Sequence, residues 1–240
     1  MTYQKRIELY KEVGDDIGAV EYVQHMGTDL TIVNSARVSF GKHKDDLDER
    51  DEKLIRYLIK HRHTSTLEHN NVTFRFTVPL FIRSQHHRHR TWSFNEVSRR
   101  YTEENIRFYE PSSFRTQHES NRQASNSDSL INPRIMHGHS SLDARSAYIE
   151  HNLSAVQLYN ELTEAGVCRE QARGVLPTCL YTEYYGTVDL SNLLKFVDLR
   201  THDGAQQEIQ VVAKACLKIA EDLWPVTVRA YREVNGLSAI

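Results

Sequence analysis

Several classes of protein are excluded by what this sequence has little of. Its 240 residues include three cysteines and five prolines, and the formal net charge is −2. The cysteines, Cys168, Cys179 and Cys216, are odd in number and lack the close spacing of a metal site, which favours a reducing cytosol over a disulfide framework. Because the net charge is close to zero, a generally basic coat for nucleic acid is excluded.

Long apolar runs and glycine-rich fingerprints are also missing. The first residues, MTYQKRIELYKEVGDD, contain no apolar signal core, and no run approaches the roughly 20 apolar residues of a membrane-spanning helix. No glycine-rich fingerprint follows a strand pattern, and neither a Pro/Gly/Ser-rich linker nor an internal repeat divides the chain. We therefore expect residues 1–240 to form one soluble, cytoplasmic domain, with neither membrane nor nucleic acid as a partner.

Hydrophobic periodicity predicts an α+β fold. Strands are expected at residues 19–26, 72–78 and 180–188, and the alternation in residues 72–78 predicts one wet or functional face. Apolar residues at helical spacing predict helices at residues 29–36, 54–60, 79–87, 144–165, 169–176, 190–200 and 205–223. Because these elements lack a regular βαβ rhythm, we expect a single mixed domain in which long helices pack an antiparallel-type sheet, and not a Rossmann fold. Residues 115–141 are polar with little periodicity, which predicts a long surface loop.

The most unusual stretch is RSQHHRHRTWSFNEVSRRY, residues 83–101. Its first 18 residues hold five arginines and one carboxylate, that of Glu96, a local charge of plus four with neutral histidines. Arginine presents a planar fork of donors suited to phosphate and to imide edges, and it keeps its charge when water is removed. Ser93, Asn95 and Ser98 are interleaved among these cations. This mixture of fixed charges with polar donors and acceptors predicts a nucleotide site.

Two other interpretations of this stretch remain open. A basic run is often only a solvated face. His86, His87 and His89 are also potential metal ligands, but the fixed charges of Arg88 and Arg90 among them disfavour a divalent ion. We therefore expect no metal site.

The same stretch carries a long sequence signature. Arg88-His89-Arg90, followed by Ser93, Asn95, Glu96, Ser98 and Arg100, resembles the motif RHR-x-x-S-x-N-E-x-S-x-R of the flavin-dependent thymidylate synthases. All eight fixed positions of the thirteen match. A motif this long, with few common residues in it, is far more specific than a lone glycine fingerprint.

Three further blocks support the resemblance and follow in the order of the family. Residues 63–69, HTSTLEH, resemble H-x-T-P-x-E-H, with Ser65 at the hydroxyl position and Thr66 where proline is usual. Residues 171–177, QARGVLP, resemble A-R-x-x-L-P, and residues 199–206, LRTHDGAQ, resemble L-R-x-x-x-x-A-Q. The resemblance covers most of the chain and is weakest in the polar segment.

By this resemblance the protein would convert dUMP to dTMP. The methylene group would come from methylenetetrahydrofolate and the hydride from reduced FAD, which NADPH regenerates, without a cysteine nucleophile. The family forms homotetramers with active sites shared between chains, and the same is expected here. The alternative is a nucleotide- or flavin-binding paralogue without catalytic activity.

The resemblance assigns roles to matching positions. The expected dUMP-binding residues are Gln85, Arg88, Glu96, Ser98, Arg100, Arg173 and Arg200. The expected FAD-binding residues are Ser65, Arg88, His89, Arg90, Glu96, Asp189, Ser191 and Lys195. Arg200 is the expected catalytic residue, because a guanidinium against the uracil imide would stabilise its ionised form and make the ring carbon nucleophilic.

Two of these arginines also have structural interpretations. Arg173 could satisfy carbonyls at a helix C-terminus. Arg200 could be an ordinary ion-pair partner for Asp198 or Asp203. Both alternatives stay open at the level of sequence.

The chain departs from the family's pattern at a few positions. Gly204 stands where relatives commonly have histidine, so a ring contact to the flavin from that position is missing. Trp92 and Phe94 fill variable positions of the signature with bulky rings, and we expect these rings to alter how flavin or folate stacks.

Overall fold

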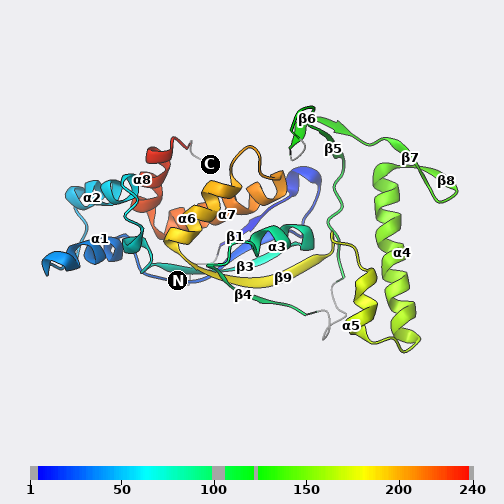
Figure 1. The fold of residues 1–240 in the computed structure, drawn as a ribbon, viewed down its shortest axis with the longest axis horizontal. Coiled ribbons are helices and arrows are strands. Elements are labelled where there is room, and N and C mark those ends of the chain that lie inside the picture. The colour runs from blue at the N-terminus through cyan, green and yellow to red at the C-terminus, as the bar shows by residue number, and fades with distance from the viewer. Residues whose placement is uncertain (1–4, 99–105, 122–123, 238–240) are drawn as a thin grey trace.

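The computed structural model describes residues 5–98, 106–121 and 124–237, and its central feature is an antiparallel sheet (Figure 1). Within the described chain the sheet has five strands in the order β1–β2–β3–β9–β4, and each neighbouring pair is antiparallel. The strands are β1 (Arg6–Glu8), β2 (Ala19–Met26), β3 (Asn71–Pro79), β4 (Ser93–Glu96) and β9 (Tyr181–Asp189). This confirms the predicted α+β fold class and three predicted strands, whereas the short edge strands β1 and β4 were not predicted.

The polar face of β3 differs from the expectation of a wet surface. Thr73 and Thr77 are only 6% and 5% exposed. The hydroxyl of Thr73 lies 2.9 Å from that of Thr187 on β9, and the exposed Arg75 pairs with Glu183 of the same strand. The prediction is therefore wrong for the two threonines, because side chains of neighbouring strands cover them.

Helices pack on the sheet and extend beyond both of its ends (Figure 1). The described helices are α1 (Asp29–Arg37), α2 (Glu49–Lys60), α3 (Leu80–His86), α4 (Ala144–Glu164), α5 (Arg169–Ala172), α6 (Leu190–Arg200), α7 (Gln207–Leu223) and α8 (Pro225–Asn235). Short 3₁₀ turns lie at Lys11–Val13, Val38–Phe40, Thr64–Leu67 and Arg173–Val175. All seven predicted helices are present, α6 with the predicted ends and the others with shifted ends. The predicted helix at residues 169–176 is an α-helix only as far as Ala172, and α8 was not predicted. No described helix combines the length and apolar character needed to cross a membrane.

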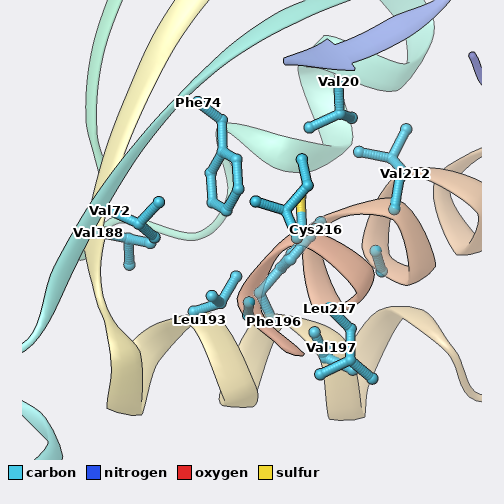
Figure 2. Packing of buried hydrophobic residues seen from close by; sticks show 14 of the residues in the cluster. Val20, Val72, Phe74, Val188, Leu193, Phe196, Val197, Val212, Cys216 and Leu217 are labelled. Atoms are coloured by element: carbon cyan, nitrogen blue, oxygen red, sulfur yellow. The ribbon is translucent and has the colours of Figure 1, made fainter. Parts of the chain in front are cut away.

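The hydrophobic core lies between the sheet and helices α6 and α7 (Figure 2). Buried side chains from the two layers meet there, among them Val72, Phe74, Val188, Leu193, Phe196, Val212, Cys216 and Leu217. At the end of β9, the carboxylate of Asp189 accepts from the backbone N–H of Asn192 at 2.9 Å and so caps α6. The core and this cap fix α6 against the sheet.

The predicted loop at residues 115–141 is wrong, because most of this segment forms two hairpins. β5 (Phe114–Gln117) pairs with β6 (Ser125–Ile131), and β7 (Arg134–His137) pairs with β8 (Ser140–Asp143). Many of their side chains are exposed, so the strands show no apolar alternation that a sequence could reveal. Gly138, at φ +58°, supplies the left-handed backbone at the tip of the second hairpin.

Candidate functional site

The arginine-rich stretch begins on α3 and continues onto β4. Pro79 ends β3 and precedes α3, and the backbone N–H of Leu80 donates to the carbonyl of Leu180 at 2.9 Å. After a turn the chain returns as β4, which pairs with β9 as far as Glu96 opposite Tyr184. The described signature residues, Arg88 to Ser98, therefore lie on a turn, on an edge strand that pairs with β9, and directly after that strand.

His86 anchors this turn from the inside. The side chain is fully buried, and Nδ1 lies 2.8 Å from the hydroxyl oxygen of Tyr184. Burial, and to a smaller extent the neighbouring His89, His87 and Arg200, lowers the pKa of His86 well below its ordinary value, so the ring is neutral. Among the described residues, no group of three or more His, Cys, Asp or Glu side chains could hold a metal ion.

Trp92 turns inward, away from any ligand. It is 5% exposed and stacks on Phe94 with 6.1 Å between ring centroids. Gly186 on β9 makes room for it, since a Cβ there would lie 2.9 Å from Phe76 and 3.2 Å from Trp92. The expectation that Trp92 alters the stacking of a flavin or folate is therefore wrong, because its ring belongs to the core.

A cleft of about 460 Å³ opens beside β4 and brings together three of the predicted dUMP residues. Glu96 accepts a forked pair of hydrogen bonds from Arg83, with Nε and Nη2 at 2.9 and 2.6 Å from Oε2. Thr182 donates to the other carboxylate oxygen at 2.8 Å. Ser98 and Arg173 line the same cleft. Glu96 is thus fixed by one cation and one hydroxyl.

The sequence alone did not identify every residue of this cleft. Arg83 belongs to the basic stretch but lies outside the signature, so only its charge could have indicated a role. Thr182 lies on a strand whose signal was its aromatic content, and nothing there indicated a contact with Glu96. Arg100 lies outside the described residues. No described residue accepts a hydrogen bond from the side chain of Arg173, so its alternative role in satisfying carbonyls at a helix end is wrong.

Arg200, at the C-terminal end of α6, belongs to a second group of residues. Its Nε donates to Nε2 of His89 at 3.0 Å, and its Nη2 donates to the backbone carbonyl of Gln85 at 3.1 Å. Burial and the nearby Arg200 lower the pKa of His89 to about 4, so the imidazole is neutral and can accept. Asp198 accepts instead from the hydroxyl of Tyr231. The interpretation of Arg200 as an ordinary ion-pair partner is therefore wrong.

Helix α3 separates the two groups. Arg83 and Gln85 are two positions apart, which is about 200° around the helix axis, so their side chains point to opposite sides. Arg83 reaches Glu96 in the cleft, whereas Nε2 of Gln85 donates to Oε1 of Gln206 at 2.6 Å, just before α7. Five of the predicted dUMP residues are thereby divided into the cleft group, Glu96, Ser98 and Arg173, and the Arg200 group, which consists of Arg200 and Gln85. Arg88 is exposed on the signature turn and belongs to neither group.

The predicted FAD residues of the signature turn present free donors. Arg88 and Arg90 are exposed, and neither guanidinium has a hydrogen bond or ion pair with a described residue. Ser65 is also exposed, on the 3₁₀ turn Thr64–Leu67, which packs against α6. Two exposed guanidinium groups on one turn suit a pyrophosphate.

The predicted FAD residues on α6 differ in availability. Lys195 is exposed, whereas Ser191 is only 6% exposed. Asp189 already accepts from both the backbone and the side-chain amide of Asn192, the latter at 2.6 Å. Its carboxylate therefore has a structural role as a helix cap whatever else it binds.

The departures at Thr66 and Gly204 have simple local explanations. Thr66 is buried, and its hydroxyl donates to the carbonyl of His63 at 3.0 Å, closing the turn that proline would otherwise stiffen. The backbone N–H of Gly204 donates to Nδ1 of His202 at 3.0 Å. An added Cβ at Gly204 would meet only the His202 ring, at 3.4 Å, so a larger side chain would fit.

None of the residues that line the cleft is a cysteine. Cys168 is exposed, whereas Cys179 and Cys216 are buried, and all three thiols are free. Burial raises the pKa of both Cys179 and Cys216, which disfavours a thiolate at either position.

Sequence comparison identifies the family of this chain. The family profile described as thymidylate synthase complementing protein matches residues 21–226. The chain belongs to this family. The flavin-dependent thymidylate synthases of Thermus thermophilus and Kosmotoga olearia are each 40% identical to it over 218 residues. These alignments cover 91% of this chain and 77% of the Thermus protein, and 89% of this chain and 90% of the Kosmotoga protein.

A solved member of similar fold is the UMP/dUMP methylase PolB from Streptomyces cacaoi, bound with 5-Br dUMP. It is 33% identical, with a TM-score of 0.77 over 95% of this chain and 97% of PolB. The matched range contains the cleft residues, the Arg200 group and α6, together with strands β3, β4 and β9 of the sheet.

Proposed function

We propose that this chain is a flavin-dependent thymidylate synthase that methylates dUMP to dTMP. Methylenetetrahydrofolate donates the carbon, and FAD, kept reduced by NADPH, supplies the hydride. The observation that carries the proposal is an arginine, Arg200, held by neutral acceptors only, alongside a cleft whose Glu96 and Arg83 are fixed as an ion pair. Relatives named flavin-dependent thymidylate synthase and a neighbour bound with 5-Br dUMP support it.

The cleft group is suited to bind and orient the nucleotide. Arg173 is exposed and has no anionic partner among the described residues, so its charge is available to a phosphate. Glu96 is balanced by Arg83 but keeps acceptor capacity for ligand N–H or O–H groups. Ser98 adds a hydroxyl that can donate or accept. These groups fix position and make no bond to the reacting carbon.

Arg200 is suited to the chemical step. A neutral imidazole and a backbone carbonyl hold its fork in place without cancelling its charge, and Nη1 has no partner among the described residues. A preorganised cation facing the uracil imide stabilises negative charge there, which makes the ring carbon electron-rich without a protein thiolate. Burial lowers the pKa of Arg200 from its ordinary value, as expected for a cation removed from water.

The residues predicted for FAD have chemistry that fits a dinucleotide. Arg88 and Arg90 would hold the pyrophosphate, Lys195 would add a cation, and Ser65 a hydroxyl donor. Asp189 and Ser191 would contribute through the N-terminus of α6, where the cap already fixes the backbone. His89 would keep the neighbouring turn in position through its bond to Arg200.

We also propose a homotetramer whose active sites are shared between chains. Within one chain the cleft and the Arg200 group lie on opposite sides of α3, so a second chain that supplies one of them would bring both groups to one nucleotide. Sedimentation of flavin-loaded protein tests this. A stable monomer that binds FAD tightly and turns over dUMP would contradict it.

The function itself is tested by isolating the protein and measuring visible flavin absorbance and product formation. Protein that carries tightly bound FAD is expected to form dTMP from dUMP with NADPH and methylenetetrahydrofolate, and omission of either co-substrate or removal of the FAD is expected to stop turnover. Protein that binds dUMP and FAD but forms no dTMP would favour the catalytically silent paralogue. A colourless protein that also fails to take up added FAD would exclude the proposal.

A second candidate substrate is UMP. PolB is named a UMP/dUMP methylase, and its structure with 5-Br UMP is 32% identical to this chain with a TM-score of 0.74. The two substrates differ only in the 2′-hydroxyl, so the assay above, repeated with UMP, distinguishes them. A kcat/KM for UMP at least equal to that for dUMP would make this chain a UMP methylase.

A further inference from the structure

A chain of polar side chains leads from Gln85 into the molecule. Gln85 donates through Nε2 to Oε1 of Gln206 at 2.6 Å, and Nε2 of Gln206 donates to Oε2 of Glu208 at 2.9 Å. Glu208 is 6% exposed in the first turn of α7. Arg115 of β5 grips both of its carboxylate oxygens, at 2.8 and 3.0 Å, and the hydroxyl of Tyr109 donates to it at 3.2 Å.

The carboxylate of Glu208 determines the orientation of the side-chain amides of Gln206 and Gln85. An ionised carboxylate only accepts hydrogen bonds, so the neighbour that faces Glu208 must be the NH₂ group of Gln206. The oxygen of Gln206 is then turned toward Gln85 and can only accept. The NH₂ group of Gln85 must therefore face inward. Its oxygen, which has no hydrogen bond with any described residue, is the atom left for a ligand.

We propose that Glu208 is a positioning residue that acts through Gln206 and presents Oε1 of Gln85 to the nucleotide as a hydrogen-bond acceptor. The inference rests on the proposed function, since it takes dUMP as the ligand near Gln85. The selected partner is an N–H or O–H donor of the nucleotide. Arg200 holds the backbone carbonyl of the same residue, so Gln85 is fixed at both main chain and side chain.

Reversing the donor-to-acceptor direction of this hydrogen-bond chain is expected to weaken dUMP binding. In Glu208→Gln the new amide can donate to the oxygen of Gln206, so Gln206 and Gln85 can both turn around. Gln85 would then direct its NH₂ group at a ligand donor, and one hydrogen bond would be replaced by a clash of two donors. We expect dUMP to bind about tenfold more weakly, the effect of one lost hydrogen bond in a site built for it.

A swapped variant separates orientation from packing. Gln206→Glu with Glu208→Gln moves the carboxylate from residue 208 to residue 206, one link closer to Gln85 in the hydrogen-bond chain. There it again accepts from Gln85 and restores the original orientation of the Gln85 amide. The matched control is Gln207→Glu with Glu208→Gln. It has the same composition and net charge, but Gln207 makes no side-chain hydrogen bond with a described residue.

The experiment measures the Kd of dUMP by calorimetry on flavin-loaded protein, together with flavin content and Tm. We expect weak binding in Glu208→Gln, recovery to within about threefold of wild type in the swapped variant, and no recovery in the Gln207 control. Equal weakening in the swapped variant and the control would overturn the inference, since only net charge and packing would then matter.

Gln206→Met covers the case in which Glu208→Gln fails to fold. It leaves the pair between Glu208 and Arg115 intact and removes only the link to Gln85. We expect the same weakening of dUMP binding, and unchanged affinity in this variant would overturn the inference. Wild-type protein that fails to bind dUMP would remove the proposed function as well, whereas wild-type binding with no effect of Gln206→Met removes the positioning role alone.

Discussion

Two arginines on opposite sides of α3 are held in contrasting ways. Arg83 is fixed by a carboxylate, because Glu96 accepts from it through both oxygens. Arg200 is fixed by a neutral imidazole and a backbone carbonyl. A carboxylate holds a guanidinium by cancelling its charge, whereas neutral acceptors hold it and leave the charge for a ligand. The difference separates an arginine that builds a binding wall from one that can stabilise charge in a reaction.

The largest expected effect is that of Arg200→Lys. Lysine keeps the charge but loses the planar fork that His89 and the carbonyl of Gln85 hold in place. We expect flavin to be retained, dUMP affinity to fall, and turnover to drop by roughly two orders of magnitude, the scale of losing one preorganised donor. Single turnover with pre-reduced flavin, dUMP and methylenetetrahydrofolate measures this.

The matched control for this substitution is Arg56→Lys, at an arginine that forms a surface pair with Glu233. It is expected to behave as wild type, because exposed ion pairs contribute little to stability. Flavin reoxidation in Arg200→Lys at the wild-type rate, with dTMP formed, would remove the catalytic role of Arg200 and make Arg173 the next candidate.

The next prediction concerns whether the cleft group of one chain and the Arg200 group of another chain form one active site. Arg200→Lys and Glu96→Gln are each expected to be nearly inactive alone. When the two are unfolded and refolded together, or co-expressed, mixed assemblies would contain some sites with neither substitution, and roughly a quarter of wild-type activity should return if each site takes the two residues from different chains. Activity that stays at the level of the separate variants would mean that one chain supplies both.

The sequence predicted this architecture well where side-chain patterns follow burial. Residues 19–26 form β2 and residues 190–200 form α6, both with the predicted ends. The pattern failed where pairing of the backbone alone decides. Many side chains of the hairpins between residues 114 and 143 are polar and exposed, so these strands have no apolar alternation to detect. Helix α8 does bury one apolar face, which includes Val228 and Tyr231, but it begins at Pro225 directly after α7 and was not predicted.

The sequence predicted which residues belong to the candidate site, but not that they form two groups on opposite sides of α3. The signature identified Glu96 and Ser98, which do share a cleft with Arg173. The predicted helix at residues 79–87 implied that Arg83 and Gln85 point in opposite directions, but the sequence could not indicate that Glu96 and Gln206 are the partners that they reach. Nor could it identify the neutral acceptors of Arg200, since contacts between residues more than 100 positions apart depend on the packed fold.

The same change of arginine to lysine on the other side of α3 sharpens the comparison. Arg83→Lys keeps a cation near Glu96 but loses the forked contact, so the wall of the cleft loosens while Arg200 is untouched. We expect the KM for dUMP to rise by about fivefold and kcat to stay within about twofold, the pattern of lost uniform binding. Steady-state kinetics measure both. A fall in kcat as large as that of Arg200→Lys would contradict the division of roles.

A smaller effect concerns acid. The pKa of His89 is lowered to about 4 in the folded chain, below the value of about 6.5 in an unfolded chain. Between these values the unfolded chain binds a proton that the folded chain does not, so this contribution to stability is present above pH about 6.5 and is lost as the pH falls toward about 4. We expect the Tm to fall over this range, and His89→Gln, which keeps an acceptor but cannot titrate, to show a shallower fall.

Thermal unfolding of the two proteins at matched ionic strength checks this prediction. His86 adds a loss of the same sign in both, since burial lowers its pKa as well. Only the difference between the two curves therefore reports on His89. Parallel curves would mean that the bond between His89 and Arg200 does not control the titration.

The smallest expected effect is that of removing every thiol. Neither Arg83 nor Arg200 has a hydrogen bond with a cysteine, and no cysteine lines the cleft. Cys168 is exposed, and the pKa of Cys179 and of Cys216 is raised by burial, so none is prepared as a nucleophile.

The triple variant with serine at Cys168 and alanine at Cys179 and Cys216 is expected to keep turnover within about threefold of wild type, with a lower Tm from the cavity left at Cys216. Comparison of kcat in folded, flavin-loaded protein separates chemistry from packing. A triple variant that binds FAD and dUMP normally and yet forms no dTMP would mean that a thiolate attacks the pyrimidine, and the charge on Arg200 would then no longer account for the activation of the ring.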